Sequence, residues 1–261
     1  MDKVFSTVDD RGVGRVTLNN PDKHNAFDDQ IIGQLTEAFA AMAANSNVRL
    51  MILASEGKSF SAGADLGWMK RMASYSHAEN LQDANALAEM LKVLYQMPQP
   101  TIARVQGAAF GGAVGLVSCC DMAVATSAAS FAFSEVKIGL VPATISPYVI
   151  AAIGERAARR YFTTGERFDA AQALRIGLVN EVVDEDSIDD SINKLSDALL
   201  ANGPQAVSAA KQLISNVSGK PIDQDLIDYT CETIADIRVS EQGQEGLQAF
   251  LGKTKPNWQK D

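Results

Sequence analysis

The stretch TIARVQGAAFGGAVGLVSCC, residues 101–120, joins an apolar segment to a glycine-rich segment that opens a short apolar helix. Residues 101–106 combine β-branched and aliphatic side chains, which indicates a strand. The small residues that follow let a ligand approach the main chain closely. The first N–H groups of a helix also lack an acceptor inside that helix. The stretch therefore predicts a strand, a tight turn and a helix whose N-terminus can face a ligand.

A second stretch repeats this design earlier in the chain. SAGAD, residues 61–65, follows a predicted strand and places small residues before a segment that can begin a helix. Two N–H groups aimed at one point would form an oxyanion hole, which stabilises negative charge developing on a carbonyl oxygen. Taken singly, each stretch is also typical of a tight turn with close helix-to-strand packing. Neither contains a GxxxxGK[ST], GxGxxG or GxSxG pattern, so we expect no phosphate loop, dinucleotide fingerprint or nucleophile elbow.

Strands and helices alternate over the first part of the chain, and the last part is helical. Strands are predicted at 13–18, 48–54, 101–106, 121–126 and 130–133, and helices at 28–44 and 80–97. This alternation predicts an α/β fold with mostly parallel strand pairing. Helical patterns follow at 188–200, 204–217 and 225–250. We therefore expect an α/β core at 1–185 and a helical C-terminal region at 186–261.

Composition and charge argue against several classes of protein. The 261-residue chain has a formal net charge of −9 with scattered acids, so it offers no footprint for nucleic acid. It shows no run of 18 uncharged apolar residues and no apolar core of a signal peptide. Its three cysteines and two histidines predict neither a disulfide framework nor a zinc site. We expect a cytoplasmic protein that needs no metal.

Glu135 is the candidate acid or base. In FAFSEVKIGLVP, residues 131–142, it has the same parity as Phe131 and Phe133, so a strand would point all three side chains to one side. Desolvation in that company would raise the pKa of the carboxyl toward the range that acid–base catalysis needs. The alternative is a strand-end acid that pairs with Lys137 or faces solvent.

The segment after SAGAD offers candidates for contact with the rest of a substrate. Trp68 and Met69 either wall an acyl pocket or pack in the core. Lys70 and Arg71 either meet a substrate carboxylate or are simply solvated. The residues alone do not decide between these alternatives.

Five stretches, read in order, resemble the crotonase, or enoyl-CoA hydratase/isomerase, superfamily over nearly the whole chain. They are NNPDKHNAF, SFSAGAD, QGAAFGGAVGLVSCCDMAVAT, FAFSEVKIGLVP and EGLQAFLGKTKPNW. GLVSCCDMA and LVPATISPYV look most like bacterial 3-methylglutaconyl-CoA hydratases and related branched-chain enoyl-CoA hydratases. The resemblance implies a β-β-α superhelix whose helical C-terminal region builds a homotrimer or a dimer of trimers. It also implies an acyl-CoA thioester substrate, with coenzyme A as part of the substrate and no separate cofactor.

The same resemblance implies roles for individual residues. Ala64 and Gly112 would supply the two N–H donors to the thioester oxygen, and Glu135 would transfer protons. Phe250 and Lys253 match positions that commonly reach coenzyme A bound to a neighbouring subunit. Further substrate-binding candidates are Lys23, His24, Ala26, Ala62, Asp65, Leu66, Trp68, Gly111, Gly115 and Pro142.

One position departs from the family pattern and leaves alternatives open. Hydratases of this family typically carry a second glutamate shortly after the glycine pair, where this chain has Gly115. Hydration by Glu135 alone is the leading hypothesis, with one water adding its hydroxyl at Cβ and its proton at Cα. Δ3,Δ2-enoyl-CoA isomerisation, which uses one glutamate at the later position, is the alternative within the family. A catalytically lapsed CoA-binding protein is the non-enzyme alternative, and a serine hydrolase is disfavoured because no motif groups its residues.

Overall fold

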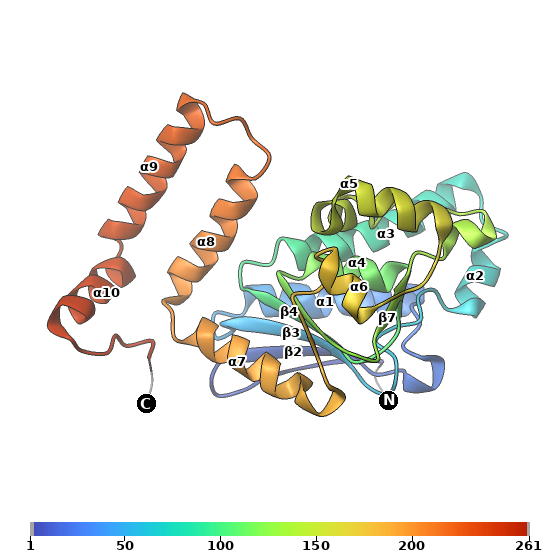
Figure 1. Cartoon of the computed structure of the whole chain (residues 1–261), viewed down its shortest axis with the longest axis horizontal. Coiled ribbons are helices and arrows are strands. Elements are labelled where there is room, and N and C mark those ends of the chain that lie inside the picture. Colours follow the sequence, from blue (N-terminus) through green and yellow to red (C-terminus); the bar gives the residue numbers. More distant parts are fainter. Residues whose placement is uncertain (1–2, 260–261) are drawn as a thin grey trace.

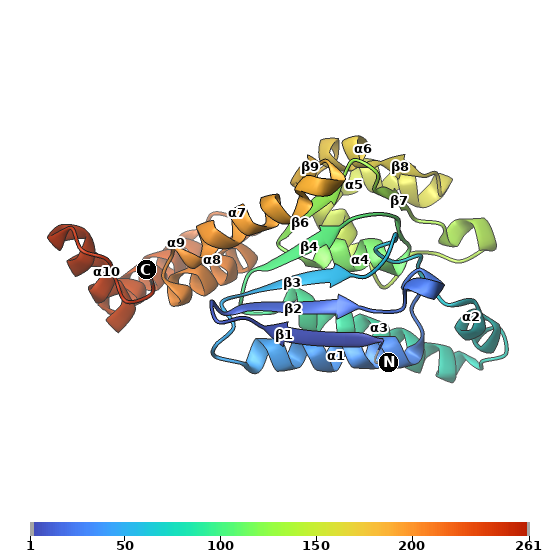
Figure 2. The ribbon, with the colours of Figure 1, turned by 90° about the horizontal axis from the view of Figure 1, so that it is seen from below.

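A six-stranded sheet is the central element of the computed structural model, which describes residues 3–259 (Figure 2). The strand order is β1-β2-β3-β4-β6-β9. The strands are Val4–Val8 (β1), Val13–Leu18 (β2), Leu50–Ser55 (β3), Thr101–Val105 (β4), Met122–Thr126 (β6) and Glu181–Val183 (β9). β1, which the sequence analysis missed, pairs antiparallel with β2, and each other neighbouring pair in this sheet is parallel. The prediction of an α/β fold with mostly parallel pairing is confirmed.

A smaller sheet lies beside the glycine-rich stretch at 107–115. It contains β5 (Ala109–Phe110), β7 (Ser130–Ala132) and β8 (Phe168–Asp169), in the order β5-β7-β8. The sequence analysis predicted a direct entry into a helix here, but β5 pairs with β7 first, and helix α4 (Gly112–Cys119) begins only after Gly111. The pairing fixes the direction in which the main chain enters α4.

Helices cover both faces of the larger sheet, and alternate strand residues serve the two faces. Met51 and Leu53 of β3 belong to the main core, which also holds residues of α1 (Asp29–Ala44), α3 (His77–Tyr95), α4 and α5 (Ser146–Thr164). Leu50, Ile52 and Ala54 point the other way, into a second cluster with α7 (Ile188–Leu200). A strand buried on both faces reads as a continuous apolar run, as β3 does.

Short elements connect this framework. They are η1 (Pro21–Lys23), α2 (Leu66–Met72), η2 (Glu135–Ile138), α6 (Ala170–Arg175) and η3 (Glu185–Ser187). The sequence analysis allowed a helix to begin after residue 65, where α2 begins, but it did not predict α5 or α6. Asp28 caps α1 by accepting a hydrogen bond from Ile31 N (2.8 Å), and Asp65 caps α2, so acidic residues mark both helix starts.

The C-terminal helices project from one end of the molecule (Figure 1). They are α8 (Pro204–Val217), α9 (Gln224–Val239) and α10 (Glu241–Gly252). The helical pattern predicted over 225–250 is confirmed as two helices, because Ser240 ends α9 and its hydroxyl caps α10 by accepting from Gly243 N (3.0 Å). Lys211 of α8 ties the extension to the body through Asp121 (2.7 Å) and the Gln99 carbonyl (3.0 Å). The boundary expected at residue 185, between the α/β core and the helical C-terminal region, stays a prediction. Helix α7 follows this boundary and still packs on the sheet.

Gly115 lies where α4 approaches α5 most tightly. A Cβ built at this position would lie 2.3 Å from Ile145 Cγ2, 2.9 Å from Ile145 Cβ and 3.5 Å from Leu91 Cδ2. Ile145 and Leu91 are both buried. The contacted atoms of Ile145 are close to the main chain, and its branched side chain has few alternative rotamers. Packing against Ile145 therefore leaves no room for a side chain at position 115.

We predict that Gly115→Ala lowers the free energy of unfolding by about 1–3 kcal/mol, the usual cost of overpacking a filled core. Gly33→Ala is the matched control, because a Cβ at Gly33 in α1 would meet no atom within 4 Å. Helix propensity alone should make that control more stable by about 0.5–1 kcal/mol. Urea denaturation of both variants measures the difference. Stabilisation of the two variants by equal amounts would contradict the packing at Gly115.

Candidate active site

Backbone hydrogen bonds join residues 61–65 to residues 24–27. Phe27 N donates to Gly63 O (2.7 Å), and Asp65 N donates to Phe27 O (2.6 Å). Ala62 N donates to the carbonyl of residue 24 (2.9 Å). SAGAD is thus held as a short extended segment, although it belongs to neither sheet.

The other edge of the same segment pairs with residues 108–110. Ser61 N donates to Ala108 O (3.0 Å), and Phe110 N donates to Ser61 O (3.0 Å). A Cβ at Gly63 would lie 3.0 Å from Phe110 O, so the two main chains are in contact. The two stretches of small residues identified in the sequence are therefore neighbours in space.

Each stretch presents an unengaged main-chain donor. The N–H groups of Ala64 and Gly112 donate to no acceptor within residues 3–259. Ala64 is exposed and Gly112 is half-buried, so a ligand can reach both. Gly63 and Gly111, which precede them, have φ of +93° and +54°, a conformation that turns the main chain away from its paired neighbours and that glycine adopts at least cost. Two free donors on adjacent segments are what an oxyanion hole requires.

The carboxyl of Glu135 lies beside this junction. A Cβ built at Gly111 would be 3.1 Å from Glu135 Oε1 and 3.6 Å from its Cδ. Burial raises the pKa of Glu135 above its ordinary value, as the sequence analysis expected. Its Oε2 is buried and has no hydrogen-bond partner among the described residues. An acid in this state can accept a proton and return it.

The prediction that Glu135 lies on a strand is wrong. β7 ends at Ala132, and Glu135 is the first residue of the 3₁₀ turn η2. Strand parity with Phe131 and Phe133 therefore does not direct its side chain. Among residues 3–259 it forms no ion pair with Lys137, so the alternative of a paired strand-end acid is not what the structure shows.

The polar candidates Lys23, His24 and Asp65 lie in or beside residues 61–65, which we name the donor segment. Lys23 Nζ lies 2.8 Å from Asp65 Oδ2, and this hydrogen bond is the main reason that the pKa of Asp65 is lowered. Asp65 Oδ1 also accepts from the first N–H groups of α2. His24 Nδ1 lies 3.1 Å from Ser59 Oγ. The cation of Lys23 is itself exposed, which leaves it accessible to an anionic ligand.

The apolar candidates differ in exposure. Leu66 is 74% exposed and Ala62 is exposed, whereas Ala26 and Pro142 are buried. Trp68 packs within the main core, and its Nε1 donates to Asp83 Oδ1 (3.2 Å). Trp68 therefore takes the core position that the sequence analysis weighed against an acyl-pocket wall.

The two cations on α2, Arg71 and Lys70, differ in their contacts with acidic side chains. Arg71 forms an ion pair with Asp29 at the start of α1. Lys70 is exposed. Of the two cations considered for a substrate carboxylate, Lys70 is the one without an acidic partner among the ion pairs of the described residues.

Three other candidates, Gly115, Phe250 and Lys253, do not belong to this cluster. Ile145 and Leu91 fill the space at Gly115, so that position holds neither an acid nor room for water. Phe250 is 79% exposed on α10, and Lys253 follows that helix. Figures 1 and 2 show α10 and α2 at opposite ends of the molecule. Phe250 and Lys253 therefore do not reach the site of their own chain.

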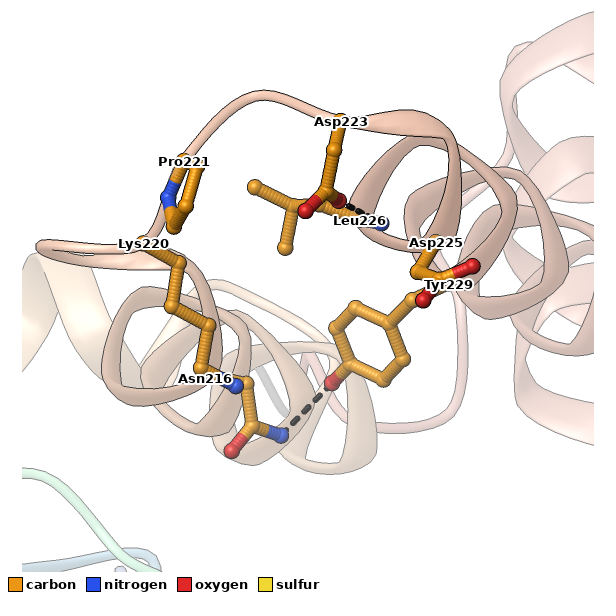
Figure 3. Close-up of a pocket in the computed structure, with 7 residues that line it drawn as sticks. All are labelled: Asn216, Lys220, Pro221, Asp223, Asp225, Leu226 and Tyr229. Atoms are coloured by element: carbon orange, nitrogen blue, oxygen red, sulfur yellow. Dashed lines mark hydrogen bonds between the residues drawn. The ribbon is translucent and has the colours of Figure 1, made fainter.

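A hollow of about 340 Å³ lies between α8 and α9 (Figure 3). Its polar side chains serve the hairpin itself. Asp223 caps α9 by accepting from Leu226 N (3.0 Å), and Asn216 Nδ2 donates to Tyr229 Oη (2.6 Å). We assign this hollow no role in catalysis, because Ala64 N–H, Gly112 N–H and the Glu135 carboxyl lie elsewhere in the fold.

Two other kinds of feature are absent from the described residues. Nowhere in residues 3–259 do three or more His, Cys, Asp or Glu side chains form a group that could hold a metal ion. No helix within the same residues combines the length and the apolar character needed to cross a membrane.

Sequence reasoning did not single out Asn25 and Gln106, which lie next to the two stretches of small residues. Both are polar side chains next to the stretches that were singled out, but nothing in their spacing shows which main-chain groups they contact. Asn25 is fully buried and has a positive φ (54°), which only the structure reveals.

Comparisons with known proteins agree with this geometry. Residues 9–261 match the family model for enoyl-CoA hydratase/isomerase. The crystal structure of an enoyl-CoA hydratase from Shewanella pealeana is 47% identical, with a TM-score of 0.95 over 98% of this chain and 96% of that one. An enoyl-CoA hydratase structure from Mycobacterium smegmatis is 32% identical, with a TM-score of 0.93 over 99% of both chains.

A curated relative extends the likeness to vertebrates. The mitochondrial enoyl-CoA hydratase domain-containing protein 3 of Xenopus laevis is 30% identical over 95% of this chain and 84% of its own length. The names of these three relatives do not specify 3-methylglutaconyl-CoA. The chain belongs to the enoyl-CoA hydratase/isomerase family, which acts on acyl-CoA thioesters, and its fold is the crotonase fold.

Proposed function

We propose that this member of the enoyl-CoA hydratase/isomerase family adds water across the 2,3 double bond of an acyl-CoA thioester. The observation that carries the proposal is the pair of unengaged N–H groups on Ala64 and Gly112 beside the half-buried carboxyl of Glu135. Negative charge grows on the thioester oxygen as water attacks Cβ. Each donor aimed at that oxygen lowers the barrier by about 3 kcal/mol.

Glu135 performs both proton transfers in this mechanism. Its carboxylate takes a proton from water while the water oxygen bonds to Cβ, and the electrons of the double bond move to the thioester oxygen. The resulting enolate is held by Ala64 N–H and Gly112 N–H. The carboxylic acid of Glu135 then returns the proton to Cα, so one water molecule supplies both added groups. The raised pKa brings the carboxyl closer to the range in which it can do both.

Isomerisation of a Δ3-enoyl-CoA to the Δ2 form is the second candidate. The packing of Ile145 against Gly115 favours it, because a second acid cannot occupy that position. Glu135 would remove a proton from C2 and return it to C4, with the same two donors holding the dienolate. Hydration adds the mass of one water to the substrate, whereas isomerisation leaves the mass unchanged.

The acyl group that we propose is branched, with 3-methylglutaconyl-CoA as the specific candidate. The resemblance of GLVSCCDMA and LVPATISPYV to branched-chain enoyl-CoA hydratases supports this choice. Exposed Lys70 on α2 is a cation available for a second carboxylate. A panel of straight, branched and dicarboxylic enoyl-CoAs compares kcat/KM directly. Higher kcat/KM for straight chains than for branched dicarboxylic chains would overturn this choice.

We predict that Glu135→Gln lowers kcat by at least about 100-fold while the dissociation constant for the acyl-CoA stays within a few-fold. The amide keeps the shape of the side chain and loses its ability to transfer protons. Steady-state kinetics with mass spectrometry of the product measures both the rate and the reaction. A wild-type product of unchanged mass would replace hydration by isomerisation. Binding without turnover in both proteins would leave only the non-enzyme alternative.

The same variant has a control in its stability. Because burial raises the folded-state pKa of Glu135, wild-type stability falls as pH rises from the ordinary glutamate pKa through the raised value. Glutamine does not ionise, so the variant should be more stable than wild type at pH 7. The difference should shrink toward about pH 4, near the unfolded-state pKa. Thermal unfolding measures this, and a variant less stable at neutral pH would contradict the burial of the charge.

We also propose that three copies assemble, alone or as a dimer of trimers, through the α8–α10 extension. Exposed apolar side chains on the extension support this assembly, because monomeric proteins rarely leave a large apolar surface exposed to solvent. Val239 is 76% exposed, Phe250 79% and Leu251 78%. Phe250 and Lys253 would then lie near coenzyme A bound to a neighbouring copy.

We predict that Phe250→Asp combined with Leu251→Asp converts the trimer to smaller species, because buried carboxylates at an apolar interface are costly. Light scattering coupled to gel filtration measures the mass. Leu174→Asp is the matched control, since Leu174 is an exposed leucine on α6 of the body. A wild-type protein that is monomeric at micromolar concentration would rule out the assembly.

A further inference from the structure

Asn25 connects the donor segment to a neighbouring turn. Its side chain is fully buried, and Nδ2 donates to Glu56 O (2.8 Å) and Ser59 O (2.9 Å). Its Oδ1 accepts from Asn20 N (2.8 Å). One amide therefore uses both its donor and its acceptor to join three pieces of main chain.

The backbone around Asn25 is strained. His24 and Asn25 have φ of 52° and 54°, in the left-handed region that non-glycine residues enter at a cost. Asparagine tolerates this region better than most residues, but two in succession persist only when surrounding contacts hold them. Ala26 and Phe27 follow directly, and Phe27 is the residue that pairs with Ala64. Contacts at Asn25 thus set where this pairing begins.

Gln106 holds the same turn from the other side. Its Nε2 lies 3.0 Å from Ser55 O, 2.9 Å from Ser55 Oγ, 3.0 Å from Gly57 O and 3.3 Å from Ser59 O. Gly107 follows, and a Cβ there would be 2.0 Å from Lys58 O, so the turn and this strand end are in tight contact. The chain then runs through β5 to Gly112.

The two amides meet at one atom. Ser59 O accepts from Asn25 Nδ2 and from Gln106 Nε2. One amide precedes the segment that pairs with Ala64, and the other precedes the segment that ends in Gly112. Residues 55–59, which we name the shared turn, therefore fix the position of these two segments relative to each other.

We propose that Asn25 and Gln106 are positioning residues for the oxyanion hole, acting through the shared turn to hold Ala64 N–H and Gly112 N–H on one point. This inference rests on the proposed function, because it assumes that both donors bind a thioester oxygen. Neither side chain touches the reacting atoms. Displacing a catalytic group by about 1 Å can cost about 100-fold in rate, so loosening the turn should act on kcat.

Gln99 supplies a matched control for ordinary structural loss. Like Gln106, it has a buried Oε1 without a partner in the described chain, and its Nε2 donates to a backbone carbonyl, that of Ala43 (3.3 Å). It lies at the opposite end of β4 from Gln106. Gln99→Ala should lower thermal stability without altering the geometry of the two donors.

The test uses 4-(dimethylamino)cinnamoyl-CoA, whose absorption moves to longer wavelength when donors polarise its thioester carbonyl. We expect wild type and Gln99→Ala to give the full shift. Asn25→Ala and Gln106→Ala should give a smaller shift, with kcat for an enoyl-CoA substrate lowered about 10- to 100-fold and KM changed less than threefold. Asn25→Asp should behave like Asn25→Ala, because it keeps the acceptor but loses both donors.

Each other outcome has a defined meaning. If Asn25→Ala and Gln106→Ala keep the full shift and kcat, and lose only thermal stability as Gln99→Ala does, the positioning role is wrong while the proposed function stands. If wild type itself gives no shift, the oxyanion hole is wrong and this inference fails with it. If Asn25→Ala does not fold, Gln106→Ala at the strand end decides the question alone.

Discussion

Main-chain pairing around residues 61–65 is the constraint on which the site depends. Residues 24–27 bond to one edge of this segment and residues 108–110 to the other, and five hydrogen bonds of 2.6–3.0 Å hold it there. A buried extended segment normally has all its N–H groups engaged. Here Gly63 and Gly111 turn the chain through positive φ, and the N–H of the residue that follows each of them has no acceptor in the described chain. The paired backbone thus leaves two donors for a ligand.

The placement of Glu135 lowers the stability of the folded protein. Glu135 is half-buried, and its buried Oε2 has no hydrogen-bond partner among residues 3–259, which costs free energy when the carboxyl is charged. The neighbourhood of Gly115 is the opposite case, because Ile145 and Leu91 pack it without space. One acid is therefore kept reactive, and the position of a second is closed by aliphatic side chains. In the proposed function, this combination would confine proton transfer to Glu135, which both hydration and isomerisation can use.

Sequence patterns predicted the fold more completely than the site. The apolar runs of β3 and β4 and the helical spacing of α1 were readable because burial repeats along them. β1 was missed, since four of its five residues are exposed and carry no apolar pattern. Glu135 was predicted on a strand because parity cannot reveal that β7 stops at Ala132. The break at Ser240 was missed because the helical pattern continues across it.

Long-range contacts explain what sequence could not supply at the site. The small residues at 61–65 and 107–115 indicated two donors, but their adjacency depends on the pairing of Ser61 with Ala109, which lies 48 positions later in the chain. The packing of Ile145 on Gly115 and the bonds of Asn25 to the shared turn arise in the same way. Such contacts are set by the whole fold, so a local pattern suggests the residue type without identifying its partner.

The most direct measurement of the central claim is a crystal structure with butyryl-CoA, a saturated acyl-CoA that cannot be hydrated. The account predicts its thioester oxygen about 2.7–3.2 Å from both Ala64 N and Gly112 N, with the Glu135 carboxyl beside Cα and Cβ. A thioester oxygen bound elsewhere, or facing solvent while these two N–H groups stay empty, would contradict it.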